Sequence, residues 1–122
     1  MSVPRRVSRP RSGFEVLWHP EADRERETIQ DARERAAISH AEEKLKALGA
    51  RLPYPHSSAV KGGGRLRELR PRGGRSRWRP MYRQIDSRTF VILAVGPEAQ
   101  IDGAGFRLAV EDAQQRFREL DT

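Results

Sequence analysis

The sequence predicts one α+β domain, in which a small antiparallel β-sheet of about four strands packs against helices. The chain has 122 residues and no cysteine, a length that suits one compact domain. Its apolar patterns follow the order strand, helix, three strands, helix, which is typical of a layered α+β architecture. The connections between the last three strands are short, and short connections favour antiparallel neighbours.

The N-terminal segment separates into a basic arm and the start of the domain. Residues 1–13 hold four arginines and no acidic residue. We therefore expect a disordered basic arm, followed by one domain over residues 14–122. Apolar side chains alternate with others over residues 14–18, which predicts a short strand.

A helical region follows this strand. Pro20 begins it, because proline is tolerated at the first position of a helix. The apolar spacing fits either one long helix or two helices with a break near residues 32–37, and Gly49 is a suitable C-terminal stop. Residues 52–64 contain two prolines and a run of three glycines, which predict a loop.

Three strands are predicted over residues 65–70, 78–85 and 89–95. The continuous apolar run at 90–95 makes the last of them the central strand, covered on both faces. Pro80 lies inside the second strand and suggests an edge position or a bulge there. An apolar stripe at helical spacing then predicts a final helix that packs on the sheet; its members are Phe106, Val110, Ala113, Phe117 and Leu120.

Positive charge is concentrated in the segment of the predicted strands. The formal net charge of the chain is +7, and residues 61–88 alone carry ten basic residues against two acidic ones. Such a segment favours a polyanion as partner, because contacts to phosphate groups release counterions and dominate affinity. A solvated face that only aids solubility is the alternative. The basic residues are Lys61, Arg65, Arg67, Arg70, Arg72, Arg75, Arg77, Arg79, Arg83 and Arg88.

The arginines of neighbouring strands predict a cationic platform. Alternate residues of a strand share a face, which groups Arg65 with Arg67 and Arg79 with Arg83. Paired strands lie about 5 Å apart, so arginines on neighbouring strands can form one cationic surface. We expect this surface to bind an RNA backbone through Arg65, Arg67, Arg70 and Arg83. RNA is cleaved when its own 2′-OH attacks the adjacent phosphate, a reaction that needs a base, an acid and positive charge on the phosphate.

Four residues are candidates for these catalytic roles. Arg79 lies in mid-strand, where it must face solvent or an anion, and is expected to act on the phosphate. His56 and Lys61 precede the strands and are candidate proton carriers, although a loop histidine is also consistent with a merely exposed side chain. Tyr82 can donate a hydrogen bond or stack on a base, or it can be a core side chain on an apolar strand face.

The composition also excludes several classes of function. Without cysteine there is no thiolate metal site, and the three histidines lack ligand spacing, so neither a metal nor a cofactor is expected. No stretch approaches the roughly 18 apolar residues of a membrane span. The N-terminus also lacks the apolar run of a signal peptide. We therefore expect a cytoplasmic protein that does not associate with membranes.

Two short motifs in the strand region match a known family pattern. Leu66, Glu68, Leu69 and Arg70 match Leu-x-Glu-Leu-Arg, and Arg79, Tyr82 and Arg83 match Arg-x-x-Tyr-Arg. On these motifs the chain resembles the RelE/ParE superfamily of bacterial toxins over about residues 14–120. The resemblance is nearest to the HigB-like, phage-derived branch.

That resemblance implies a small α+β fold with a twisted antiparallel sheet, and a type II toxin neutralised by a helix-turn-helix antitoxin. Many members bind the ribosomal A site and cut mRNA there without a metal. By position, Arg79 matches the arginine thought to act on the scissile phosphate, while Lys61 and Arg70 match further basic residues. We therefore expect a ribosome-dependent endoribonuclease whose partners are the ribosome, mRNA and an antitoxin.

The segment after the last strand departs from this family. Many relatives carry Lys or Arg there and then a catalytic Tyr or His, whereas residues 96–102 contain none of these. Asp102 is the one acid–base candidate that we assign in this segment. The departure keeps two other functions open: a non-catalytic toxin of the ParE type that poisons DNA gyrase, and a plain nucleic-acid-binding module.

Overall fold

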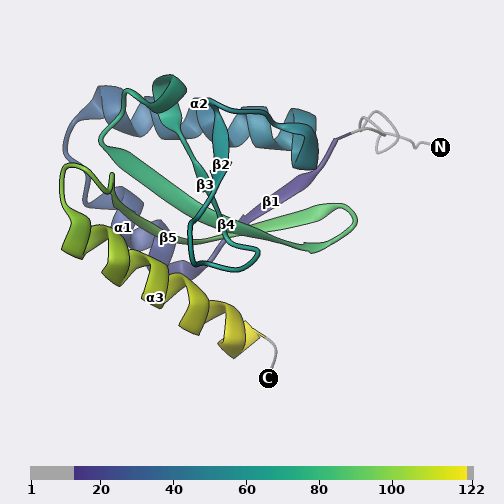
Figure 1. Ribbon diagram of the computed structural model, residues 1–122. Helices are drawn as coiled ribbons and strands as arrows, with labels where there is room; N and C mark the ends of the chain where they lie inside the picture. Colours follow the sequence, from purple (N-terminus) through teal and green to yellow (C-terminus); the bar gives the residue numbers. More distant parts are fainter. Residues whose placement is uncertain (1–12, 121–122) are drawn as a thin grey trace.

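The computed structural model describes residues 13–120, so the predicted basic arm lies almost wholly outside the described residues. Five strands and three α-helices make up the fold (Figure 1). In chain order they are β1 (Glu15–Trp18), α1 (Pro20–Glu27), α2 (Ala32–Leu48), β2 (Ser57–Ala59), β3 (Arg67–Leu69), β4 (Trp78–Asp86), β5 (Thr89–Pro97) and α3 (Gly103–Leu120). Two 3₁₀ turns, η2 (Gly49–Arg51) and η3 (Pro71–Gly74), follow α2 and β3.

The strands form one mixed sheet in the order β1-β5-β4-β3-β2. β1 pairs in parallel with β5, and the other neighbours are antiparallel. The predicted α+β class is confirmed, but the sheet has five strands and is not wholly antiparallel. The chain passes from β1 through helices α1 and α2 to β2, at the opposite edge of the sheet. Strands β2 to β5 then form a meander that returns to β1, and β5 runs parallel to β1. Strand β2 lies in the segment predicted as a loop.

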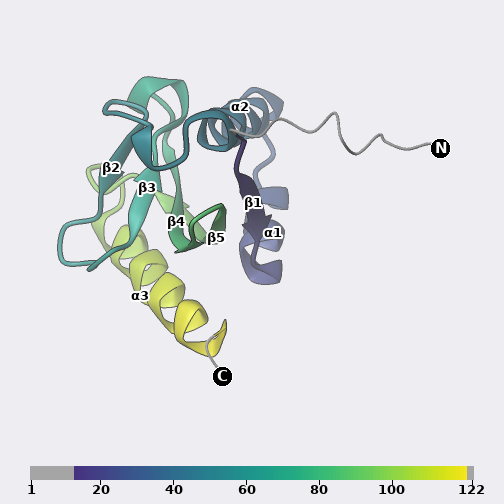
Figure 2. The ribbon, with the colours of Figure 1, turned by 90° about the vertical axis from the view of Figure 1, so that its right-hand side faces the viewer.

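Helices cover both faces of this sheet. Helix α2 lies on one side of it and α3 on the other (Figure 2). The core beneath α1 and α2 includes Leu45, Tyr82 and Phe90, and the core beneath α3 includes Met81 and Leu93. Residues 90–93 of β5 alternate between the two cores, which confirms that the apolar run at 90–95 is covered on both faces. The prediction that it is the central strand was wrong, because β5 is an interior strand and β4 occupies the middle of the sheet.

The helical region consists of two helices, one of the two arrangements that the sequence left open. The break falls at residues 28–31, slightly before the predicted position. The Asp31 carboxylate caps α2 by accepting a hydrogen bond from the Arg33 backbone N–H at 2.9 Å. His19 caps α1 in the same way, because its Nδ1 accepts a hydrogen bond from the Glu21 backbone N–H. Pro20 occupies the first helical position, as predicted.

Strand β4 is irregular beside its proline. The register against β5 shifts between Met81 and Tyr82, immediately after Pro80. Strand β3 pairs with β4 only through Met81 and Tyr82, so the nitrogen of Pro80 meets no ladder partner from β3. The predicted bulge is therefore confirmed, whereas β4 as a whole is an interior strand and not an edge.

Candidate nucleic-acid interface

A groove on the α3 face of β3 and β4 brings together part of the predicted site. Its volume is about 270 Å³. We call it the Arg79 groove; its lining residues are Ala59, Val60, Lys61, Glu68, Arg70, Arg79, Glu98, Ala99, Gln100 and Phe106. Three cations from three segments therefore meet at one place, and two carboxylates lie beside them.

Arg79 forms the buried floor of this groove and not an exposed surface. Its side chain is 2 % exposed. Its terminal nitrogens donate to the backbone carbonyls of Ser76 at 2.6 Å, Trp78 at 3.1 Å and Gly74 at 3.1 Å. Of the two surroundings expected for a mid-strand arginine, solvent or an anion, solvent is excluded here, because the loop before β4 supplies carbonyl acceptors that replace water.

The remaining nitrogen of Arg79 points to an acidic residue of the groove. Arg79 Nε has no hydrogen-bond partner and lies 3.8 Å from Glu68 Oε2. Burial lowers the pKa of the Arg79 guanidinium from its ordinary value, and the negative charge of Glu68 opposes that shift. Arginine nevertheless stays protonated in proteins, so the floor of the groove carries a fixed positive charge in a water-poor setting.

Glu68 is part of the Leu-x-Glu-Leu-Arg motif, but the sequence assigned it no role. In the structure its carboxylate holds neighbouring side chains of the groove. Its Oε2 accepts hydrogen bonds from Arg70 at 3.0 Å and Ser58 Oγ at 3.1 Å. It therefore neutralises part of the charge of Arg70 and Arg79 and fixes both side chains. Glu98, which follows β5, is a second acid of the groove that sequence reasoning missed, because nothing in the sequence shows that the residue after β5 shares a groove with Glu68 and Arg70.

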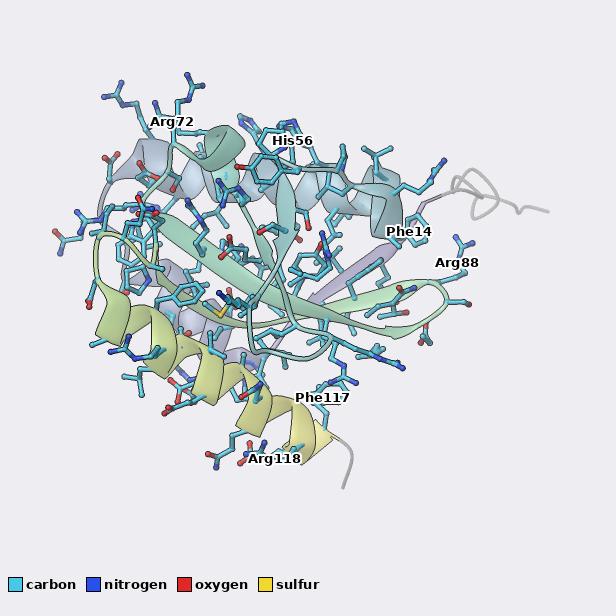
Figure 3. All side chains as sticks on the ribbon, in the orientation of Figure 1. Phe14, His56, Arg72, Arg88, Phe117 and Arg118 are labelled. Atoms are coloured by element: carbon cyan, nitrogen blue, oxygen red, sulfur yellow. The ribbon has the colours of Figure 1, made fainter. Side chains whose placement is uncertain are left out.

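His56 lies apart from this groove, on the side of α2 (Figure 3). Its Nδ1 is 3.3 Å from Lys44 Nζ, and both line a smaller hollow of about 110 Å³ with His40. The structure therefore separates the two predicted proton carriers. Lys61 belongs to the Arg79 groove, and His56 faces a different surface.

Tyr82 occupies the position of a core residue. It is 2 % exposed, and its ring meets the Phe90 ring edge-on with centroids 5.8 Å apart. The Tyr82 hydroxyl shares a 2.6 Å hydrogen bond with Ser57 Oγ, which also accepts from Arg67 Nε at 3.1 Å. No ring face of Tyr82 is available for stacking on a base in this arrangement.

The predicted cationic platform is divided between two places. Arg70 lines the Arg79 groove, whereas Arg65, Arg67 and Arg83 line a separate hollow of about 550 Å³. Arg83 also contacts α3, because its guanidinium carbon lies 3.8 Å from the centroid of the Phe117 ring. The four predicted RNA-binding arginines therefore do not form one continuous surface with Arg79.

Comparisons with known proteins match the fold alone. No family model matches the sequence, and no curated protein matches it. Among solved structures, the chain resembles the E. coli toxin RelE in the free state, in a variant with two arginines replaced by alanine. The TM-score is 0.58 at 15 % sequence identity, over 85 % of this chain and 97 % of the other. The architecture is therefore RelE-like. Among residues 13–120, no helix is both long and apolar enough to cross a membrane.

Proposed function

We propose that this chain is the toxin of a toxin–antitoxin pair and arrests translation by cutting mRNA in the ribosomal A site. The observation that carries the proposal is the Arg79 groove, in which Lys61, Arg70 and Arg79 converge beside two carboxylates. A RelE-like fold supports the same assignment. The ribosomal part rests on the family resemblance, and it implies a cytoplasmic site of action.

The proposed reaction uses the message's own 2′-hydroxyl. The 2′-oxygen attacks the neighbouring phosphorus, and the bond from phosphorus to the 5′-oxygen of the next nucleotide breaks. The products are a 2′,3′-cyclic phosphate and a 5′-hydroxyl end. No metal takes part in this scheme, and the ribosome orients the message for in-line attack.

Four side chains of the groove receive roles in this scheme. The buried charge of Arg79 stabilises the negative charge that develops on the phosphate. Glu98 accepts the 2′-hydroxyl proton, and Lys61 Nζ donates a proton to the leaving 5′-oxygen. These two side chains line the groove, and neither forms a side-chain hydrogen bond within residues 13–120. Arg70, which Glu68 holds in place, binds a phosphate oxygen.

The antitoxin is proposed to cover this groove. An acidic or amphipathic segment of a helix-turn-helix antitoxin would neutralise the cations that the phosphate needs. A structure of the complex that leaves the Arg79 groove open to solvent would contradict this part of the proposal.

A non-catalytic gyrase toxin is the second candidate. The observation that favours it is the burial of Arg79, whose terminal nitrogens are occupied by three backbone carbonyls. Residues 96–102, which carry no Lys, Arg, Tyr or His, favour it too. This candidate predicts DNA damage signalling while messenger RNA stays intact.

Mapping of mRNA 5′ ends after brief induction in a bacterium tests the proposal. The wild type is compared with Lys61→Ala, which removes one exposed cation of the groove, and with Arg33→Ala, which removes an exposed cation on α2. New 5′-hydroxyl ends inside translated codons, reduced in Lys61→Ala and retained in Arg33→Ala, are expected. Growth arrest with intact messages and inhibited DNA supercoiling would establish the gyrase candidate, and unimpaired growth would exclude both toxins.

A further inference from the structure

Arg83 is a cation without an acceptor in the part of the chain that the structure describes. Its Nε is buried and has no hydrogen-bond partner. None of the ion pairs among residues 13–120 includes it. The Phe117 ring covers one face of the guanidinium at 3.8 Å. Arg83 is partly buried, and within residues 13–120 its guanidinium has no anionic partner. The N–H donors at its tip are therefore available to an external oxyanion.

Other arginines surround this unpartnered cation. Arg83 lines two hollows, one of about 550 Å³ with Arg65 and Arg67, and one of about 280 Å³ with Arg118. Phe117 and Arg118 lie at the C-terminal end of α3 (Figure 3). The larger hollow is also lined by the acidic Asp86, which accepts a hydrogen bond from the Arg88 backbone N–H at 2.9 Å, and no acidic residue lines the smaller hollow within residues 13–120. Positive charge therefore exceeds negative charge at this place.

The backbone around Arg83 leaves room for an extended ligand. Strand β3 pairs with β4 only at Met81 and Tyr82. From Arg83 to Asp86, strand β4 continues beyond the end of β3, beside the larger hollow. Arg83 thus lies just past the pairing of β4 with β3, where its side chain lines the larger hollow.

Charge balance distinguishes this place from the Arg79 groove. In that groove Glu68 and Glu98 oppose the cations, and Arg79 is held by backbone carbonyls. At Arg83, the aromatic ring covers the face of the guanidinium and leaves its edge, which carries the terminal N–H donors, for an external oxyanion. A phosphodiester supplies two such oxygens and one negative charge.

We infer that Arg83, flanked by Arg65 and Arg118, binds a phosphodiester of single-stranded RNA outside the Arg79 groove. Phe117 is the positioning residue that holds the guanidinium. This inference deepens the proposed function and rests on it. RNA is then held at two separated points, one at the reacting phosphate and one at the Arg83 site (Arg65, Arg67, Arg83, Phe117 and Arg118), and the second contact supplies affinity without chemistry.

Fluorescence anisotropy with a labelled single-stranded oligouridylate tests the Arg83 site in the purified full chain. Binding is measured over a series of KCl concentrations for wild type, Arg83→Gln, Arg118→Gln and the matched control Arg33→Gln. We expect Arg83→Gln to raise Kd about tenfold. The slope of log affinity against log salt should fall by about 0.7 for Arg83→Gln and for Arg118→Gln, one lost phosphate contact each. Arg118 is exposed, so its variant stays informative if Arg83→Gln is poorly folded.

A second pair of variants tests the role of Phe117. Phe117→Leu should weaken binding about threefold, because the guanidinium loses its aromatic support. Phe117→Tyr keeps the aromatic ring and should bind RNA with wild-type affinity. Retained affinity in this variant would show that the ring itself is needed, and that Phe117→Leu does not weaken binding merely by destabilising the fold. If both variants bind as wild type does, Phe117 has no positioning role.

The outcomes separate this inference from the proposed function. Equal binding by Arg83→Gln, Arg118→Gln and Arg33→Gln, or no binding by wild type, overturns the Arg83 site. Cleaved messages in cells together with such a result would leave the proposed nuclease standing. Arg83-dependent binding with intact messages in induced cells would support the Arg83 site and exclude mRNA cleavage.

Discussion

Glu25 of α1 and Arg116 of α3, 91 positions apart, together complete the hydrogen bonding of β5 where β1 ends. β1 pairs with β5 only as far as Ile92. Beyond that point Glu25 Oε1 accepts from the Val95 N–H at 2.9 Å, and Arg116 donates to the Leu93 carbonyl at 2.8 Å. The two side chains also pair with each other at 2.8 Å. A carboxylate and a guanidinium thus take the place of a strand and fix two helices to the sheet.

Loss of this pair should destabilise the fold. Arg116→Leu leaves the Leu93 carbonyl and the Glu25 carboxylate without their partner. Both side chains are partly exposed, at 14 % and 32 %, so we expect a loss of about 2 kcal/mol, less than for a fully buried pair. Urea denaturation measures the change, with Arg107→Leu on the exposed surface of α3 as the control. Equal stability of the two variants would contradict the structural role of Arg116.

The turn between β4 and β5 should make stability depend on pH. Hydrogen bonds from the Arg88 backbone and then from Thr89 lower the pKa of Asp86 from its ordinary value of 3.8. A lowered pKa means that the stabilisation is present above the ordinary value and is lost as the pH falls through the folded-state value. The difference in Tm between wild type and Asp86→Asn should therefore shrink between neutral pH and acid. A difference that is constant over this range would contradict the assignment.

Close approach of β5 and α3 should forbid a side chain at Gly96. A Cβ built on Gly96 would lie 2.4 Å from the Ala109 Cβ, which is too close for two carbons. Gly96→Ala should push the helix from the sheet and cost about 1–3 kcal/mol in unfolding free energy. Gly103→Ala is the matched control, because its Cβ would meet only the flexible end of Arg107 at 3.5 Å. The double variant Gly96→Ala/Ala109→Gly should recover part of the loss in the same denaturation experiment.

Arg79 should contribute to stability as well as to the proposed chemistry. Arg79→Leu removes the hydrogen-bond donor of three backbone carbonyls at and before the start of β4, and it leaves Glu68 without one of its two neighbouring cations. We expect a loss of about 3 kcal/mol, whereas Lys61→Ala at an exposed position should change stability by less than about 0.5 kcal/mol. Thermal unfolding of both variants separates the two roles. Full stability of Arg79→Leu would show that the carbonyl contacts are dispensable.

Tyr82 should prove structural. Tyr82→Phe removes the hydroxyl that bonds to the fully buried Ser57. The expected cost is about 1 kcal/mol. Growth arrest after induction should be unchanged, because the ring has no exposed face. Loss of toxicity in a fully folded Tyr82→Phe protein would restore the catalytic assignment that the sequence suggested.

Periodic patterns in the sequence predicted most of the helices and strands, because burial imposes them locally. The apolar run at 90–95 and the stripe of α3 are of this kind. Strand β2 could not be predicted, because three residues are too few to show alternation. The parallel pairing of β1 with β5 depends on a contact between distant segments. For the site, the family resemblance named Lys61, Arg70 and Arg79 as basic residues, and the structure brings all three to one groove. Glu98 and the isolation of His56 follow only from how the loops fold back.

The pairing of the first strand with the last has a consequence for how the chain is made. Of the described elements β1 is synthesised first, whereas its strand partner β5 and the helix that carries Arg116 come last. Contacts between such distant segments are slow to form and late. Incomplete chains that stop before β5 have no partner for β1, no support behind Arg79 and no Glu98. Synthesis must therefore pass β5 before the groove exists, and chains that stop earlier are expected to be inert.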